Sequence, residues 1–200
     1  MDYFSATATI MITLFYTLIR TFHLFPKQPL RPRGHPAMYL LIFLFTLAYV
    51  MHLGYLLSTP RFDYGWNVIF NMIMGSTHLI LWTLFSLRFS YRLAWWPLRM
   101  IPTPYPPLDP LQITPKPSWS TRSALLVATT TLAMSLELID FPPLWRSIDA
   151  HSLWHLSTVF IGRGWYGFLV RDVVMLEAVR QGMGGGKAVE RAEGVEGGGR

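Results

Sequence analysis

Three stretches of this chain are each as long as a membrane-spanning helix and contain no charged residue: residues 3–19, 34–60 and 64–87. A helix needs about 20 mostly apolar residues to cross the hydrocarbon core of a bilayer. Pro36 lies where the second helix would begin, and proline is well suited to the first turn of a helix. The pattern predicts three spans, at about residues 3–22, 36–58 and 64–87.

Two later segments predict a fourth and a fifth span, at about residues 122–139 and 150–170. The fourth contains Glu137, and the fifth contains His151, His155 and Arg163. Ionisable groups at membrane depth are expensive, so these helices would insert only where neighbouring helices shelter those side chains. The fold class predicted is therefore an all-α, polytopic membrane helix bundle with five spans over residues 1–172.

The composition agrees with a membrane protein and excludes several other classes. Apolar residues make up 52% of the chain and charged residues 14%, against about 25% in an ordinary soluble protein. The absence of cysteine excludes a disulfide scaffold, a cysteine zinc finger and a thiol nucleophile. The net charge of +6 does not indicate nucleic acid as a partner, because the basic residues lie between apolar runs.

The basic residues also predict the orientation in the membrane. Fourteen of the 17 lysines and arginines lie after the first span, after the third span, or in the C-terminal tail. Cytosolic connections are enriched in Lys and Arg, so the N-terminus is expected in the lumen and the C-terminus in the cytosol. Residues 97–117 are expected to form a proline-rich cytosolic linker, and residues 173–200 a disordered glycine-rich cytosolic tail.

On this topology, acidic residues and histidines gather at the luminal ends of the predicted spans. The members of this group are Asp2, His52, Asp63, Glu137, Asp140, Asp149, His151 and His155. Ionisable residues within membrane segments mark functional sites by default. The sequence therefore predicts a site in the luminal leaflet.

His151 and His155 are the strongest candidates for metal ligands in this group. They are four residues apart, so on a helix both imidazoles project from one face and can reach a single ion. Asp2 from another helix could bind the metal or orient its water. The alternative is that both histidines simply form hydrogen bonds to neighbouring helices.

Residues 136–160, LELIDFPPLWRSIDAHSLWHLSTVF, resemble the C-terminal signature of the GPI-anchor lipid-remodelling family, the Per1-like proteins of the post-GPI-attachment-to-proteins factor type. HLGYLL at 52–57 and RFDYGWN at 61–67 resemble a middle segment of that family, and MDYFSA at 1–6 resembles the start of its third membrane helix. The resemblance covers residues 1 to about 172.

The resemblance implies a fold and a chemistry. The family is grouped with alkaline ceramidases and adiponectin-type receptors, which are seven-helix and metal-dependent, with zinc held by two histidines of the last helix and one of an early helix. Carried over by motif, His151 and His155 are the late pair and Asp2 is the acid that holds the metal-bound water. His52, Asp63, Glu137 and Asp140 are candidates for contacts to those ligands or to the lipid headgroup.

The activity that the resemblance implies is removal of an acyl chain from the inositol phospholipid of GPI-anchored proteins, in the membrane of the endoplasmic reticulum or the Golgi. The partners would be GPI-anchored proteins or GPI lipid, together with membrane lipids. The family has two further helices and a luminal region upstream, so an N-terminally truncated member, or a gene model begun at an internal methionine, is expected. Whether the chain is an enzyme stays open. The alternative is a non-catalytic membrane factor, or an inactive truncated form, that binds GPI-anchored cargo.

Overall fold

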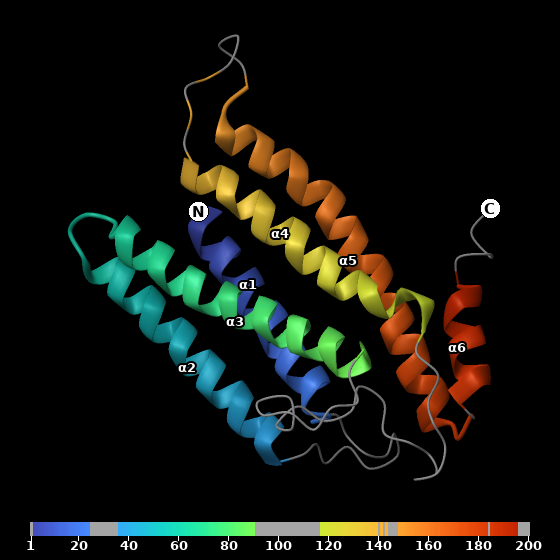
Figure 1. The fold of residues 1–200 in the computed structure, drawn as a ribbon. Helices are drawn as coiled ribbons and strands as arrows, with labels where there is room; N and C mark the ends of the chain where they lie inside the picture. The colour runs from blue at the N-terminus through green and yellow to red at the C-terminus, as the bar shows by residue number, and fades with distance from the viewer. Residues whose placement is uncertain are drawn as a thin grey trace. The chain divides into compact units, whose positions relative to one another are not determined.

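The computed structural model describes residues 2–24, 36–90, 117–139, 141, 143, 148–183 and 185–195. The regular structure in these ranges is helical, which confirms the predicted all-α class. The helices, drawn in Figure 1, are α1 (Asp2–Thr21), α2 (Pro36–Ser58), α3 (Tyr64–Ser90), the short 3-10 helix η2 (Ser118–Thr121), α4 (Arg122–Ile139), α5 (Ala150–Arg180) and α6 (Gly185–Gly194).

The chain divides into two compact units. The first contains α1, α2 and α3 as far as Phe85, and the second contains η2, α4, α5 and α6. Each unit is described by itself below. The proline-rich linker predicted at 97–117 lies outside the described residues except for Pro117, which is extended and precedes η2.

In the first unit, α2 and α3 form a hairpin whose turn is fixed by one side chain (Figure 1). Asp63 precedes α3, and its Oδ1 accepts a hydrogen bond of 2.9 Å from the backbone N–H of Trp66. An aspartate in this position satisfies one of the backbone donors that the first turn of a helix leaves free. Asp63 therefore starts α3 as its N-terminal cap.

The interior of the first unit is a line of packed side chains along one face of α1, which is called the seam below. Leu14 and Leu81 are buried, and partly buried apolar side chains from all three helices, including Leu18, Phe45 and Met74, pack around them. Arg20 is also fully buried near the end of α1, and its guanidinium lies 5.0 Å from the ring centre of Phe85. The seam is thus apolar in its middle and contains a cation at one end.

The outer surface of the first unit is apolar, which identifies it as a membrane domain. Among the described residues, three helices are long and apolar enough to cross a membrane, and they lie at the first three predicted spans: Tyr3–Thr21, Pro36–Ser58 and Tyr64–Leu87. In α2, the consecutive side chains of Ile42, Phe43 and Leu44 are all exposed, so apolar surface covers much of the circumference of the helix. Exposed apolar surface of this extent is typical of a lipid-facing helix.

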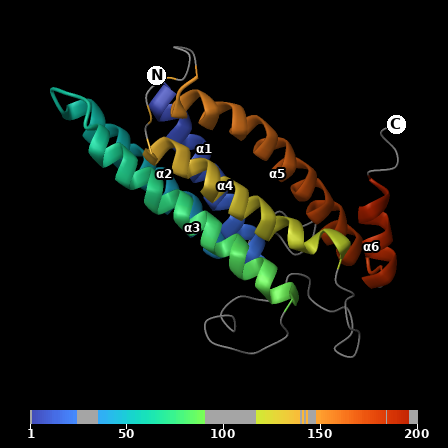
Figure 2. The same cartoon turned by 45° about the horizontal axis from the view of Figure 1, so that its top comes forward.

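In the second unit, α4 and α5 form an antiparallel hairpin, and both views show them side by side (Figures 1 and 2). A Cβ atom at Gly164 would lie 2.6 Å from Leu126 Cδ2, so the glycine allows α4 to approach α5 closely. One turn away in α4, Thr130 Oγ1 accepts a hydrogen bond of 3.3 Å from the indole N–H of Trp165. Both helices lie at the predicted positions, but neither is among the candidate spans, so their insertion stays a prediction.

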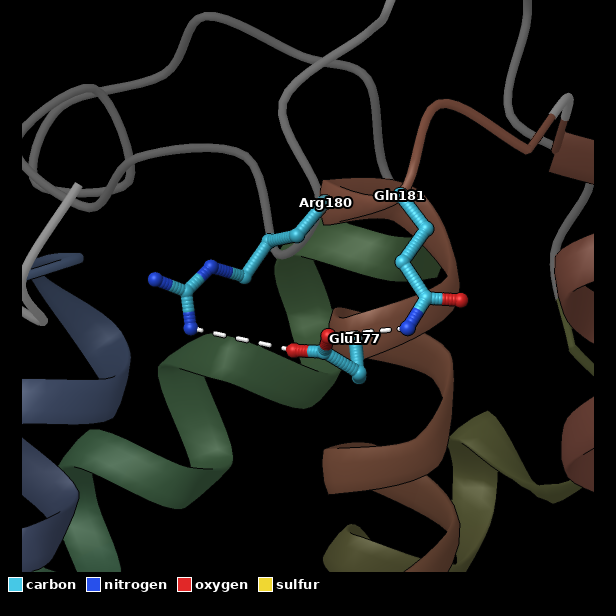
Figure 3. Close-up of polar contacts among 3 residues, drawn as sticks. All are labelled: Glu177, Arg180 and Gln181. Atoms are coloured by element: carbon cyan, nitrogen blue, oxygen red, sulfur yellow. Dashed lines mark hydrogen bonds and ion pairs between the residues drawn. The ribbon is translucent and has the colours of Figure 1, made fainter. Parts of the chain in front are cut away.

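Over the described part of the predicted tail, residues 173–183 and 185–195, the structure differs from the expectation of disorder. Helix α5 continues to Arg180, where Glu177 contacts both Arg180 and Gln181 (Figure 3). Gly182 then adopts a φ of 81°, which ends the helix with a left-handed glycine turn. Helix α6 follows, because residues 185–194 have an apolar face that packs on α5.

Two alanines make that face. Ala188 and Ala192 are spaced four residues apart and are fully buried. Arg191 adds a hydrogen bond of 3.1 Å from its Nη1 to Oε1 of Gln181, and Glu193 accepts one of 2.6 Å from the hydroxyl of Ser118. Ala188 and Ala192 have the spacing of a helix, but the segment is short and rich in glycine, a composition that favours disorder, and the prediction followed the composition.

Candidate functional site

The histidine pair lies in the first two turns of α5, where a capping box fixes the start of the helix. Asp149 Oδ1 accepts a hydrogen bond of 2.7 Å from the backbone N–H of Ser152, and Ser152 Oγ accepts one of 3.0 Å from the backbone N–H of Asp149. These reciprocal bonds hold the first turn of the helix in a defined conformation. Asp149, which the sequence places among the luminal acids, is therefore engaged in capping.

The backbone arrangement of the pair fits two ligands of one metal ion. His151 and His155 are one helical turn apart, and residues four apart lie on the same face of a helix. The side chain of His155 is exposed and so accessible, while that of His151 lies outside the described residues. Among the residues whose side chains are described, no group of three or more His, Asp or Glu could hold a metal ion. The described part of α5 can therefore provide two metal ligands at most.

Three of the predicted acids, the metal candidate Asp2 and the contact candidates Glu137 and Asp140, are described in part or not at all. Asp2 is the first residue of α1 and Glu137 lies in the last turn of α4, but their side chains lie outside the described residues. Asp140 lies outside the described residues altogether. The assignment of these acids to a metal or to a headgroup stays a prediction.

His52 belongs to a polar cluster inside the first unit, together with Asn67 and Thr7. The side chains of all three are buried, with 2% of His52 exposed. His52 Nε2 lies 3.2 Å from Asn67 Oδ1, and the Thr7 hydroxyl lies 3.4 Å from the same oxygen. One amide oxygen therefore links α1, α2 and α3, and it does so within three membrane-spanning segments.

The hydrogen bond between His52 and Asn67 has a defined direction. Since an amide oxygen can only accept, Nε2 of His52 is the donor in this pair. Nδ1 is buried and has no hydrogen-bond partner among the described residues. The ring also stacks on Phe70, with the two ring centres 4.1 Å apart. This environment gives His52 a role in holding α2 on α3; its predicted contact to metal ligands or headgroup stays untested.

The same region holds the first turn of α1, which carries Asp2. The hydroxyl of Thr7 lies 3.0 Å from the carbonyl oxygen of Tyr3, and the hydroxyl of Tyr49 donates a bond of 3.2 Å to that of Phe4. Neither Thr7 nor Asn67 is among the residues that sequence analysis singled out. Asn67 could have been found, because an amide within an apolar span needs a partner.

Asp63 contacts a neighbouring helix in addition to capping α3. Its Oδ2 accepts a hydrogen bond of 2.8 Å from the hydroxyl of Tyr55 in α2. The backbone N–H of Trp66 and the Tyr55 hydroxyl both stabilise the carboxylate, so the pKa of Asp63 is lower than the ordinary 3.8. The predicted contact of Asp63 to a headgroup is untested, but its contacts explain how the α2–α3 turn is held.

Comparison with known proteins identifies the family. The model of the Per1-like family matches residues 1–173. The chain is similar to the protein PER1 homolog of Schizosaccharomyces pombe, with 35% identity over 86% of this chain and 43% of the relative. It is also similar to the GPI-specific phospholipase A2-like PGAP3 of Homo sapiens, with 31% identity over 88% of this chain and 45% of the relative.

The PGAP3 of Danio rerio gives the same result, with 32% identity over 88% of this chain and 45% of the relative. The chain thus spans less than half the length of these curated relatives. No solved structure matches it. The family match covers α1 to α4 and most of α5, including the histidine pair and the His52–Asn67–Thr7 cluster. With its three membrane-spanning helices and this match over most of its length, the chain is a multi-pass membrane protein of the Per1-like family.

Proposed function

We propose that this chain takes part in remodelling the lipid of GPI anchors, as a metal-dependent hydrolase that removes an acyl chain from the inositol phospholipid. The observation that carries the proposal is the match of residues 1–173 to the Per1-like family, which has relatives named GPI-specific phospholipase A2-like. The substrate would be GPI lipid or a GPI-anchored protein. The site of action would be the luminal leaflet of the endoplasmic reticulum or the Golgi, with the N-terminus luminal and the C-terminus cytosolic.

His151 and His155 are the residues that would hold the metal, which we propose to be zinc. The support is their spacing on one face of α5, the capping box that fixes the start of this helix, and the exposure of His155. Zinc bound there would polarise the ester carbonyl and lower the pKa of water. Further ligands would come from outside the described side chains.

Asp2 would act as the general base. In the proposed step, the oxygen of a water molecule forms a bond to the ester carbonyl carbon while Asp2 accepts a proton from that water. The bond from this carbon to the glycerol oxygen then breaks, and Asp2 returns the proton to the leaving oxygen. The products are a free fatty acid and a lipid with one hydroxyl in place of the ester. Thr7 and Tyr49 support this role, because they hold the first turn of α1 through the carbonyls of Tyr3 and Phe4.

The proposal is tested by a matched pair of histidine variants. The purified chain is reconstituted in vesicles containing GPI lipid with a labelled acyl chain, and both acyl release and bound zinc are measured. His155→Asn should lose release and metal together. His23→Asn is the control: His23 lies in the turn after α1 with a φ of 54°, which asparagine adopts easily, so this variant should keep both acyl release and zinc.

A second function has one observation in its favour. The described side chains of the polar cluster, Thr7, His52 and Asn67, are engaged in helix packing, as expected of a non-catalytic membrane factor that binds GPI-anchored cargo. The same assay separates the two. Binding of GPI lipid without zinc and without acyl release would favour the factor, whereas release that His155→Asn leaves unchanged would contradict the histidine metal site.

A further inference from the structure

The first unit contains an apolar pocket between α1 and α2, with a volume of about 260 Å³. Its wall on α1 is formed by Ala8, Met11, Ile12 and Phe15. The spacing of these residues places them along one face of the helix over two turns. The pocket is therefore a groove that runs along α1.

The wall on α2 has the same spacing and is formed by Ile42, Phe45, Thr46 and Tyr49. At one end of the groove Phe15 and Phe45 meet edge to face, with their ring centres 5.6 Å apart. At the other end lies Tyr49, whose hydroxyl is already bonded to the carbonyl oxygen of Phe4. The hydroxyl of Tyr49 thus has a hydrogen-bond acceptor, and the groove surface is mostly apolar, with Thr46 as the other polar residue of the wall.

The level of the groove in the membrane points to the kind of molecule that it accepts. Both walls lie within membrane-spanning segments. At 1.5 Å per residue, the wall residues of α1 lie about 9 to 20 Å along the helix from Asp2. The hydrocarbon layer of one leaflet is about 15 Å thick. An acyl chain with its ester at the level of Asp2 would therefore run past Ala8, Met11 and Ile12, which lie about 9 to 15 Å from Asp2.

We propose that the α1–α2 groove binds a fatty acyl chain of the substrate lipid, with the ester toward the end of α1 that carries Asp2. This inference rests on the proposed function and adds the acyl-chain site to it. Ala8 has the smallest side chain of the α1 wall, so it leaves room for the chain near the Asp2 end. Methionine and aromatic walls adapt to a flexible alkyl chain without a polar requirement.

The test is photo-cross-linking, which needs no turnover. The purified chain in phosphatidylcholine vesicles is titrated with a phosphatidylinositol that carries a diazirine in the middle of one acyl chain. Labelling at Met11 and Phe45, wall residues that are buried or partly buried, is located residue by residue and should saturate and be displaced by unlabelled lipid. Labelling at Leu40 and Leu47, which are exposed on α2 outside the groove, should rise in proportion to the probe.

Two pairs of variants test the shape of the groove. Ala8→Phe fills it, so saturable labelling should fall about tenfold. Ala6→Phe adds the same ring at an exposed position of α1 outside the groove and should leave labelling unchanged. If Ala8→Phe does not fold, Thr46→Phe fills the groove from α2, and Leu47→Phe is its control.

The outcomes separate this inference from the proposed function. Saturable labelling that Ala8→Phe or Thr46→Phe removes supports the groove, even when no acyl release is detected and the hydrolase proposal fails. Labelling that does not saturate would contradict the proposed acyl-chain site, even when acyl release is intact. Labelling that both variants of a pair change equally would contradict it as well. Cross-links between groove residues of two copies of the chain also overturn it, because a second copy would then cover this face.

Discussion

Helices α1 and α2 lie side by side in one unit, yet the less apolar of the two is the more buried. The mean hydropathy of the α1 window is 1.2, and 39% of it is buried. The corresponding values for α2 are 2.1 and 11%. In a soluble protein the most apolar helix would be expected in the core. Here lipid solvates apolar side chains as well as protein does, so the polar side chains set which helix is central.

The polar side chains of α1 illustrate this point. Thr7 and Thr17 are fully buried and lie near side chains of α3: Thr7 near Asn67, and Thr17 2.8 Å from Nδ1 of His78. The hydroxyls of α1 thus link it to its neighbour at two levels of the membrane. The contrast predicts that substitutions in the seam of α1 destabilise the unit, whereas similar substitutions on α2 have little effect.

The largest expected difference is between two leucines. Leu14 is 3% exposed in the seam of α1, and Leu57 is 71% exposed on α2. Leu14→Ala leaves a cavity and should lower the free energy of unfolding by about 2 kcal/mol. Leu57→Ala only exchanges contacts with lipid and should change it little. Unfolding in mixed micelles measures both, and equal effects would refute the contrast.

A smaller effect is expected from the amide that joins the three helices. Asn67→Ala removes the acceptor of His52 and the oxygen that lies 3.4 Å from the Thr7 hydroxyl. It should destabilise the unit by roughly 0.6 kcal/mol, the average for one interhelical hydrogen bond in a membrane protein, because the Thr7 hydroxyl keeps the carbonyl oxygen of Tyr3 as its acceptor. Thr77→Ala is the control, since the Thr77 hydroxyl bonds only within α3, to Ile73. A double-mutant cycle between His52→Ala and Asn67→Ala should give a non-zero coupling energy; additivity would mean that the pair does not interact.

The smallest expected effect is local and depends on pH. The pKa of Asp63 is lower in the folded protein than its ordinary 3.8, so the stabilisation is complete above that value. It is lost as the pH falls through the lowered pKa, which would expose the first turn of α3. Hydrogen exchange at the backbone amide of Trp66, the donor to Asp63, should therefore be constant from pH 7 to 5 after correction for intrinsic rates, and faster under strongly acidic conditions. A change centred near neutral pH would instead indicate another group, and Asp63→Asn should remove the acid transition.

Much of the fold was predictable because spans depend on local composition. The uncharged runs that predict α1, α2 and α3 are long enough to cross a membrane whatever their neighbours are. The ends of the helices were harder to predict. Helix α5 continues to Arg180 and α6 follows it, because Ala188 and Ala192 fit against α5, a contact that their four-residue spacing alone does not determine.

The candidate site also has features that the sequence predicts and others that depend on the tertiary structure. The spacing of His151 and His155 is a property of the chain, and their place on one face follows once α5 forms. The roles of Asp63 and His52 were not predictable, since Asp63 finds Tyr55 and His52 finds Asn67 only across the hairpin.

The sequence by itself determined which segments are apolar enough to enter a membrane and which ionisable residues accompany them, because both depend on residue type and spacing. Only the tertiary structure decided that α1 contributes the buried seam and α2 the exposed face, and that Asn67 joins three helices. The physical reason is that a polar group in an apolar medium must find its partner in space. That partner is often far along the chain, as Thr7 and Asn67 show.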